Sequence, residues 1–175
     1  MRIIGGAARG RQLKAKLPPT VRPTTDMARE AIFSMVDARG GVEGEVVVDL
    51  YCGSGAMGIE AMSRGAEACY FVDTDAECLA AARTNWEALN LPGTVHFVKA
   101  ALPKWTIPTE VGVIFADPPY GPLDVEALLA GTQAHMAIIE NDRYAPAPAG
   151  WTVEKEKRYG TTLVTVLSAT GEDEA

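Results

Sequence analysis

The clearest candidate for a ligand site is a glycine-rich loop with a carboxylate on either side. Residues 53–58 read Gly-Ser-Gly-Ala-Met-Gly and match the pattern G-x-G-x-x-G. Glycines in this pattern allow a tight turn and let a ligand approach backbone N–H groups, as in nucleotide-binding loops. Asp49 lies four residues before Gly53, and Asp73 lies 20 residues after it. We therefore expect Gly53 and Gly55 to help bind a nucleotide-type ligand.

The charge of Asp49 helps to choose between such ligands. A carboxylate in this crevice would repel the pyrophosphate of NAD or FAD and would favour a ligand with cationic groups. S-adenosylmethionine (SAM) has an ammonium and a sulfonium and no phosphate. Asp73 has the spacing of an acid that holds ribose hydroxyls. Alternatively, Asp49 ends a strand or caps a helix and Asp73 is a turn residue, but the loop and both acids together favour SAM.

A second candidate site is the segment Asp117-Pro118-Pro119-Tyr120. Two prolines make this backbone rigid and remove two N–H donors. The Asp117 carboxylate and the Pro118 carbonyl could accept both N–H bonds of a planar exocyclic amine and aim its nitrogen at a methyl donor. Tyr120 offers a flat face on which a base could stack. The alternative is a Pro-Pro turn with a surface tyrosine, and proximity to the glycine loop favours the catalytic interpretation.

Both segments sit in a pattern of alternating strands and helices. Apolar runs predict strands at 46–50, 68–73, 95–98, 111–116 and 136–140, and two alternating strands near 152–157 and 162–167 form a hairpin. Helices are expected from Thr24 or Thr25 to about 37, and at 55–64, 75–90 and 123–130. This order predicts an α/β fold with a parallel sheet, helices on both faces and an antiparallel strand at one edge. Residues 2–16 read as a further short hairpin.

Composition limits the class of protein. The 175 residues suffice for one domain or one domain with a short appendage, and 47% hydrophobic with 22% charged residues argues against disorder. The three cysteines and two histidines form no C-x-x-C or Cys/His cluster, so we expect no zinc site, no disulfide framework and a reducing cytoplasm. No apolar run is long enough for a membrane span.

Charge is distributed unevenly along the chain. Residues 1–29 carry seven basic residues against one acidic residue, a charge of +6, whereas the remainder carries 9 basic and 22 acidic residues, a charge of −13. The basic arm suggests contacts with phosphates. The alternative is a solvated edge hairpin whose charges only prevent aggregation, and the segment itself does not choose between the two.

These residues together resemble a known family. Asp49 with Gly53-Ser54-Gly55 and the Asp-Pro-Pro-Tyr segment is similar to SAM-dependent amino-group methyltransferases. The N-terminal block narrows this to RsmD-type bacterial enzymes, which methylate the exocyclic N2 of a guanine in 16S ribosomal RNA. The residues that carry the closer resemblance are Met1-Arg2-Ile3-Ile4-Gly5-Gly6, Arg9-Gly10-Arg11, Arg22-Pro23-Thr24-Thr25-Asp26, Arg29-Glu30, Tyr51-Cys52-Gly53-Ser54-Gly55-Ala56 and Gly58-Ile59-Glu60.

The resemblance implies a Rossmann-like, seven-stranded methyltransferase sheet, which we expect at residues 23–170, after a basic N-terminal β-hairpin at residues 1–22. It also implies a substrate that is the small ribosomal subunit or an assembly intermediate. The polar, acidic composition of residues 171–175 predicts a disordered tail, and we expect a cytoplasmic monomer. SAM would lie at Asp49, Gly53, Gly55, Asp73 and the backbone near Ala101, and the target amine at Asp117, Pro118 and Tyr120. Phosphates would lie at Arg9 and Arg11, and the substrate mouth at Arg22, Thr24, Thr25 and Asp26.

One segment departs from the family pattern. Relatives often carry Asp or Asn after the third strand to meet the adenine amine, whereas residues 98–101 read Val-Lys-Ala-Ala. We expect backbone groups to supply that contact and SAM to bind more weakly. Three other functions stay open: a DNA adenine-N6 methyltransferase, a protein-glutamine methyltransferase, or an RNA-binding assembly module without catalysis.

Overall fold

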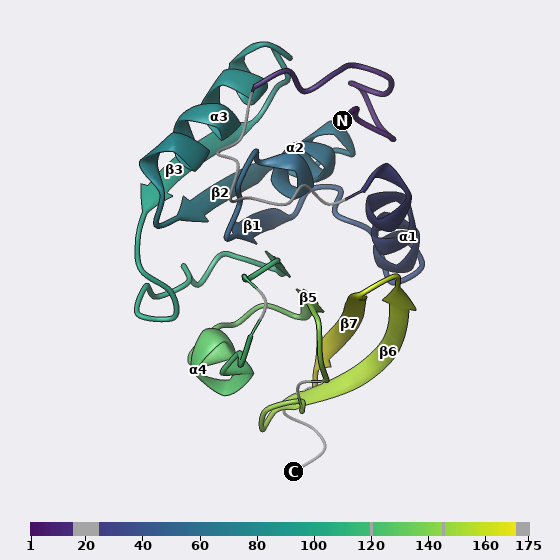
Figure 1. Ribbon diagram of the computed structural model, residues 1–175, viewed down its shortest axis with the longest axis vertical. Coiled ribbons are helices and arrows are strands. Elements are labelled where there is room, and N and C mark those ends of the chain that lie inside the picture. Colours follow the sequence, from purple (N-terminus) through teal and green to yellow (C-terminus); the bar gives the residue numbers. More distant parts are fainter. Residues whose placement is uncertain (16–24, 120, 145, 171–175) are drawn as a thin grey trace.

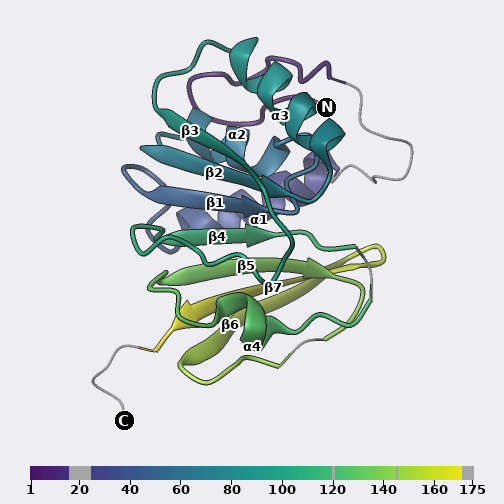
Figure 2. The same cartoon turned by 90° about the vertical axis from the view of Figure 1, so that its left-hand side faces the viewer.

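A seven-stranded mixed sheet forms the centre of the computed structural model, which describes residues 1–15, 25–119, 121–144 and 146–170 (Figures 1 and 2). The strand order is β3-β2-β1-β4-β5-β7-β6. Neighbours among the first five strands pair in parallel, and β7 pairs antiparallel with both β5 and β6. The predicted fold class is therefore confirmed, including the antiparallel hairpin at one edge. The strands are β1 (Val46–Leu50), β2 (Ala68–Asp73), β3 (Thr94–Lys99), β4 (Val113–Ala116), β5 (Met136–Asn141), β6 (Trp151–Tyr159) and β7 (Thr162–Ala169).

Helices cover both faces of the sheet. The helices are α1 (Asp26–Asp37), α2 (Ala56–Ser63), α3 (Ala76–Glu87) and α4 (Val125–Leu129). The first three pack on one face in a core that includes Val47 of β1, whereas α4 packs on the other face in a core that includes Val48. Figure 2 shows α4 in front of the sheet and α1 behind it. Because both faces of the central strands are covered, these strands are almost wholly apolar.

Side-chain caps fix where the helices begin. The Thr25 hydroxyl accepts a hydrogen bond from Ala28 N at 3.2 Å and starts α1, and Asp75 accepts one from Glu77 N at 2.8 Å and starts α3. Both caps agree with the sequence prediction. Helix α3 ends at Glu87, three residues before the expected end, and is followed by Asn90 with a positive φ of 48°. In the part of the chain that is described, no helix is long and apolar enough to cross a bilayer.

The N-terminal arm, residues 1–15, belongs to the same core as the sheet. It turns back on itself as expected, but the pairing is limited to one antiparallel bridge between Arg2 and Gln12. Ile3, Ala8 and Leu13 are buried in the core formed with α1, α2 and α3. A Cβ on Gly6 would lie 1.7 Å from the Ser63 carbonyl oxygen, so the turn of the arm packs directly against the end of α2. The expected tail, residues 171–175, lies outside the described residues.

Candidate active site

Four acidic side chains lie on one face of the sheet where neighbouring parallel strands end. They follow, by two residues each, side chains that are buried in the core with α1, α2 and α3, so the period-two alternation of strands directs them to that same face. Among the described residues, no group of three His, Cys, Asp or Glu side chains could hold a metal ion. Negative charge concentrated in this way favours a cationic ligand, so the cluster is a candidate ligand site. Its members are Asp73 in β2, Asp49 in β1, Asp117 directly after β4, and Glu140 in β5.

Asp49 is the most constrained of the four acids. It is only 3% exposed, and it accepts a hydrogen bond from Gly58 N in the first turn of α2 at 2.9 Å. Burial raises the pKa of the Asp49 carboxyl, the bond from Gly58 opposes this rise, and the charges of Asp117 and Asp73 add to it. The predicted alternative, a cap on the next helix, is thus present in the structure. A buried carboxylate under this strain favours a cationic ligand, because a cation would offset both the desolvation and the repulsion.

Asp73 holds the glycine-rich loop in place. One carboxylate oxygen accepts from Gly53 N at 3.0 Å and the other accepts from Asp75 N at 2.9 Å. Gly53 and Gly55 have φ values of 50° and 76°, which favour glycine. The 20-residue spacing between Gly53 and Asp73 therefore brings a carboxylate onto the loop itself.

Two glycines of the loop have a packing role that the motif did not predict. A Cβ on Gly55 would lie 2.9 Å from the Ala82 Cβ, and one on Gly58 would lie 2.5 Å from Cε1 of Phe71. These positions allow α2 to lie close to β2 and α3. At both positions the structure explains glycine by helix packing, whether or not a ligand also contacts the loop.

The Asp-Pro-Pro segment begins beside the glycine loop. Asp117 N donates to Leu50 O at the end of β1 at 3.4 Å, so the segment starts next to the strand that carries Asp49. The Asp117 side chain is half-buried, Pro118 is buried and Pro119 is exposed. Tyr120 lies outside the described residues. Asp49 and Asp117 are neighbours, as expected, and the Asp-Pro-Pro segment begins next to the strand that leads into the glycine-rich loop.

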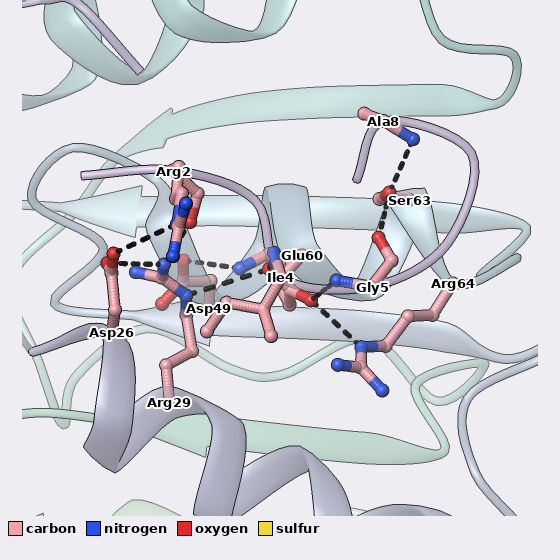
Figure 3. A network of polar contacts seen from close by, with 11 residues as sticks. Arg2, Ile4, Gly5, Ala8, Asp26, Arg29, Asp49, Glu60, Ser63 and Arg64 are labelled. Atoms are coloured by element: carbon pink, nitrogen blue, oxygen red, sulfur yellow. Dashed lines mark hydrogen bonds and ion pairs between the residues drawn. The ribbon is translucent and has the colours of Figure 1, made fainter. Parts of the chain in front are cut away.

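Glu60 organises a network that the sequence did not reveal (Figure 3). Its fully buried carboxylate accepts from Ile4 N at 2.8 Å and from Gly5 N at 2.7 Å in the arm. It also pairs with Arg64 at 2.9 Å and with Arg29 of α1 at 3.6 Å. Sequence reasoning assigned Glu60 no chemistry, because a glutamate inside a short helix gives no sign of its partners. The network fastens α2, which follows the glycine loop, to the arm and to α1.

The arm also contacts α3 through two polar side chains. Arg11 donates to the carbonyl oxygens of Leu89 and Ala88 at 2.5 and 2.6 Å, just past the end of that helix. Asn85 is buried; its carbonyl oxygen accepts from Ala15 N at 2.9 Å and its amide donates to Ser54 O at 3.0 Å. The arm is thereby connected to the glycine loop from a second side. Nothing in the sequence singled out Asn85, because its partners lie 70 and 31 residues away.

The other residues that were predicted to contact a ligand or RNA lie at α1, in the arm and after β3. Thr25 caps α1, Asp26 pairs with Arg29 at 3.0 Å, and Arg9 is exposed. Arg22 and Thr24 lie outside the described residues. Ala101 lies just past the end of β3, where its carbonyl oxygen accepts from Trp105 N at 3.2 Å. Ala100 N donates to Asp73 O at 3.1 Å, so the end of β3 is bonded to the end of β2, which carries Asp73, the residue expected to bind ribose hydroxyls.

This sheet, with buried carboxylates at its carboxyl edge and a glycine loop opening into a helix, defines a SAM-dependent methyltransferase. The donor set fits that cofactor, because carboxylates line the place where a cationic ligand without phosphates would lie. The chain belongs to the RsmD family, since the family model described as Conserved hypothetical protein 95 matches residues 1–168.

Similar proteins cover almost the whole chain. YlbH of Bacillus subtilis is 34% identical over 94% of this chain and 91% of its own length. Ribosomal RNA small subunit methyltransferase D of Escherichia coli K12 is 31% identical over 100% of this chain and 94% of its own length. The solved structure of the yhhF protein from Escherichia coli covers 97% of both chains with a TM-score of 0.80 and 27% identity. An RNA methyltransferase from Salinibacter ruber in complex with S-adenosyl-L-homocysteine has the same fold, with a TM-score of 0.66 and 19% identity over 86% of this chain and 95% of its own.

Proposed function

We propose that this methyltransferase transfers a methyl group from SAM to the exocyclic N2 of a guanine in 16S ribosomal RNA. The observation that carries the proposal is the position of Asp117 and Pro118, a rigid pair of acceptors beside the strand that bears Asp49. The ribosomal substrate is supported by relatives named ribosomal RNA small subunit methyltransferase D. The enzyme would act in the cytoplasm, as a monomer, on the small subunit or its assembly intermediate.

The acceptors would activate the amine by position. The lone pair of an exocyclic amine is delocalised into the ring, so the nitrogen is a weak nucleophile. The Asp117 carboxylate and the Pro118 carbonyl accept its two N–H bonds, hold it in line with the methyl group and stabilise the positive charge that grows on nitrogen. As the N–C bond forms, Asp117 is placed to take the proton that the nitrogen releases. SAM supplies a methyl group on sulfur whose leaving group is already activated, and Tyr120 would stack on the base.

At the cofactor end, each residue would meet a different part of SAM. Asp49 would hold the ammonium group, and Asp73 the ribose hydroxyls. The loop at Gly53 and Gly55 would lie against the cofactor, and backbone groups near Ala101 would meet the adenine. The buried carboxylates support this arrangement, because a charge-assisted hydrogen bond to a cation gives back part of their desolvation cost.

The RNA-binding surface would include the arm and the beginning of α1. We propose that Arg9, Arg22, Thr24, Thr25 and Asp26 face the RNA at the substrate mouth, as the family resemblance implies. Arg11 is a weaker candidate than the sequence suggested, because its guanidinium already caps the chain after α3. Arg9→Ala should lower the slope of log affinity against log salt by about 0.9 if Arg9 contacts one phosphate of a duplex, and by less for a single strand. Arg11→Ala should mainly reduce stability, and an equal change of slope in both variants would return Arg11 to the interface.

Transfer of labelled methyl groups tests the proposal directly. Wild-type protein, tritiated SAM and either small ribosomal subunits, free 16S RNA or DNA would be incubated, and the modified base mapped. We expect label on N2 of one guanine in the subunit. Label on DNA adenine or on protein glutamine would establish one of the alternative activities, and the absence of transfer to every substrate would favour an assembly module.

Two variants test the role of the acceptor segment. Asp117→Ala should abolish transfer while calorimetry still shows SAM binding, and Tyr120→Ala should lose much more activity than Tyr120→Phe because stacking does not need the hydroxyl. Asp37→Ala is the matched control: Asp37 is half-exposed and pairs with Arg64 on the surface, so its loss should leave transfer unchanged. Full activity of Asp117→Ala would refute the mechanism.

A further inference from the structure

Glu140 is the acid of the cluster that the proposed reaction has not used. It lies on β5 next to Asp117, because the register pairs Ile139 with Ala116 and the next residues of the two parallel strands are Glu140 and Asp117. Neighbouring strands are about 4.8 Å apart. Ile138 and Phe115, two residues earlier on each strand, are buried in the same core, so Glu140 and Asp117 face the same side of the sheet.

Two hydrogen bonds hold the acceptor segment against the end of β5. The Asn141 amide donates to Gly121 O at 3.5 Å, and the Asp142 carboxylate accepts from Gly121 N. Asn141 and Asp142 directly follow Glu140, and Gly121 directly follows the segment 117–120. The pairing of Ala116 with Ile139 at one end and these bonds to Gly121 at the other hold this part of the chain beside β5.

The surroundings of Glu140 keep it nearly closed to water. The residue is 4% exposed. Burial raises the pKa of the Glu140 carboxyl, Asp117 and then Asp49 raise it further by charge repulsion, and Arg29 lowers it. Arg29 is fully buried, and its Nε and Nη1 atoms have no hydrogen-bond partner among the described residues. Glu140 is thus a buried acid beside Asp117 that also feels the charge of Arg29. Hydrogen bonds are stronger where water is excluded, so such a group could recognise the donors of a base.

We propose that Glu140 is a specificity-determining residue that accepts the N1–H of the target guanine while Asp117 and Pro118 hold its N2 amine. This inference rests on the proposed function. In guanine, N1–H and the N2 amine lie on one edge and are both donors, which matches two neighbouring acceptors. In adenine, the ring nitrogen next to the amine is itself an acceptor and would face the Glu140 oxygens with repulsion.

Arg29 supports this arrangement as a positioning residue. Its guanidinium donates to Arg2 O and to Asp26, and it lies 3.6 Å from Glu60, so these contacts fix its position inside the protein. From this fixed place it opposes the repulsion of Glu140 by Asp117 and Asp49. Its charge lowers the pKa of Glu140 against the larger effects that raise it, while its own Nε and Nη1 have no hydrogen-bond partner among the described residues.

The test replaces the target base by one that lacks N1–H and the C6 oxygen. Small subunits would be reconstituted with 16S RNA that carries either guanine or 2-aminopurine at the methylated position. 2-Aminopurine keeps the amine but lacks N1–H, and its N1 accepts. We expect wild-type kcat/KM to be at least tenfold higher on guanine. Glu140→Gln has an amide that donates to N1 of 2-aminopurine, so the preference for guanine should fall at least tenfold, while the dissociation constant for SAM stays unchanged.

Two further variants separate recognition from stability. Glu140→Asp keeps the acceptor on a shorter side chain and should retain the preference for guanine with a raised KM. Thr165→Val is the matched control, because Thr165 is a buried polar residue on the neighbouring strand β7 but faces the other side of the sheet. It should leave the base preference unchanged.

The outcomes are distinct. Equal wild-type rates on the two bases would overturn the role of Glu140 while the proposed function stands. An unchanged preference in both Glu140 variants, with both rates reduced alike, would do the same and would leave Glu140 a partner of Arg29. Failure of the wild type to methylate the guanine subunit would refute the proposed function itself, and the inference with it.

Discussion

Replacement of Glu60 by alanine should destabilise the protein strongly, because its buried carboxylate joins α2 to Arg29 of α1 and to the Ile4 and Gly5 amides of the arm. The change would leave Arg29, which is fully buried, with the half-exposed Asp26 as its remaining ion-pair partner among the described residues. Breaking a buried ion pair by removing one partner costs about 3–5 kcal/mol. Since Asp26 compensates Arg29 in part, we expect about 3 kcal/mol, a large part of the about 5–15 kcal/mol that stabilises a typical domain.

Urea unfolding measures this loss. With an m-value of about 2 kcal/mol/M, a loss of 3 kcal/mol moves the midpoint down by about 1.5 M. Hydrogen exchange gives a second readout: the Ile4 and Gly5 amides, which donate to Glu60, should lose their protection. Glu67→Ala is the matched control, because Glu67 is exposed, and it should move the midpoint very little. A loss below about 1 kcal/mol for Glu60→Ala, with the Ile4 amide still protected, would refute the reasoning.

Three further predictions concern the cofactor loop and the thiols. Asp49→Asn should weaken SAM binding about 10- to 100-fold in calorimetry, because a hydrogen bond to a charged group contributes about 1.5–3 kcal/mol. The pKa of Asp49 is raised in the folded state, so the free energy of unfolding should fall as pH rises from the ordinary pKa of an aspartate to the folded-state pKa. Asp49→Asn removes this titration and should flatten that fall. An unchanged slope would contradict the argument. Gly55→Ala should cost about 2–4 kcal/mol from backbone strain and overpacking, whereas Gly10→Ala, which has a positive φ but open space, should cost only about 1–2 kcal/mol; equal losses would show that packing is irrelevant. Burial raises the pKa of Cys78 to about 11 and that of Cys52 still higher, so mass spectrometry should find neither thiol alkylated in native protein at pH 8, and rapid labelling of either would contradict the burial.

The sequence predicted the elements whose signals are local. The run of valines at 46–50 marks a strand covered on both faces, and Thr25 and Asp75 mark helix starts, because each signal lies within a few residues of its effect. The strand-loop-helix context of the glycine motif predicted the position of Asp49 correctly for the same reason. Neighbouring parallel strands then bring Asp49 and Asp117 together, although they are 68 positions apart in the chain.

Contacts between distant segments could not be predicted in this way. The bonds from the arm to Glu60 join residues 55 and 56 positions apart, and Asn85 joins the arm to the glycine loop through partners 70 and 31 positions away. Arg11 shows the consequence: a basic residue in a basic segment suggested a phosphate contact, whereas the structure uses it to cap the chain after α3. Charge patterning reports which residues are basic but does not report what lies opposite them.

The arrangement of charge explains why this site needs so much support. Asp49 and Glu140 are nearly closed to water, and both have raised pKa values because burial and neighbouring acids disfavour their charged forms. A protein without a use for such groups would gain stability by losing them. In the proposed complex, a cationic cofactor and a base edge rich in donors would turn the same repulsion into binding free energy. Glu60 and Arg29 join α1, α2 and the arm through buried contacts, and α2 also donates the Gly58 amide to Asp49, so the network supports the helix that contacts one of the acids.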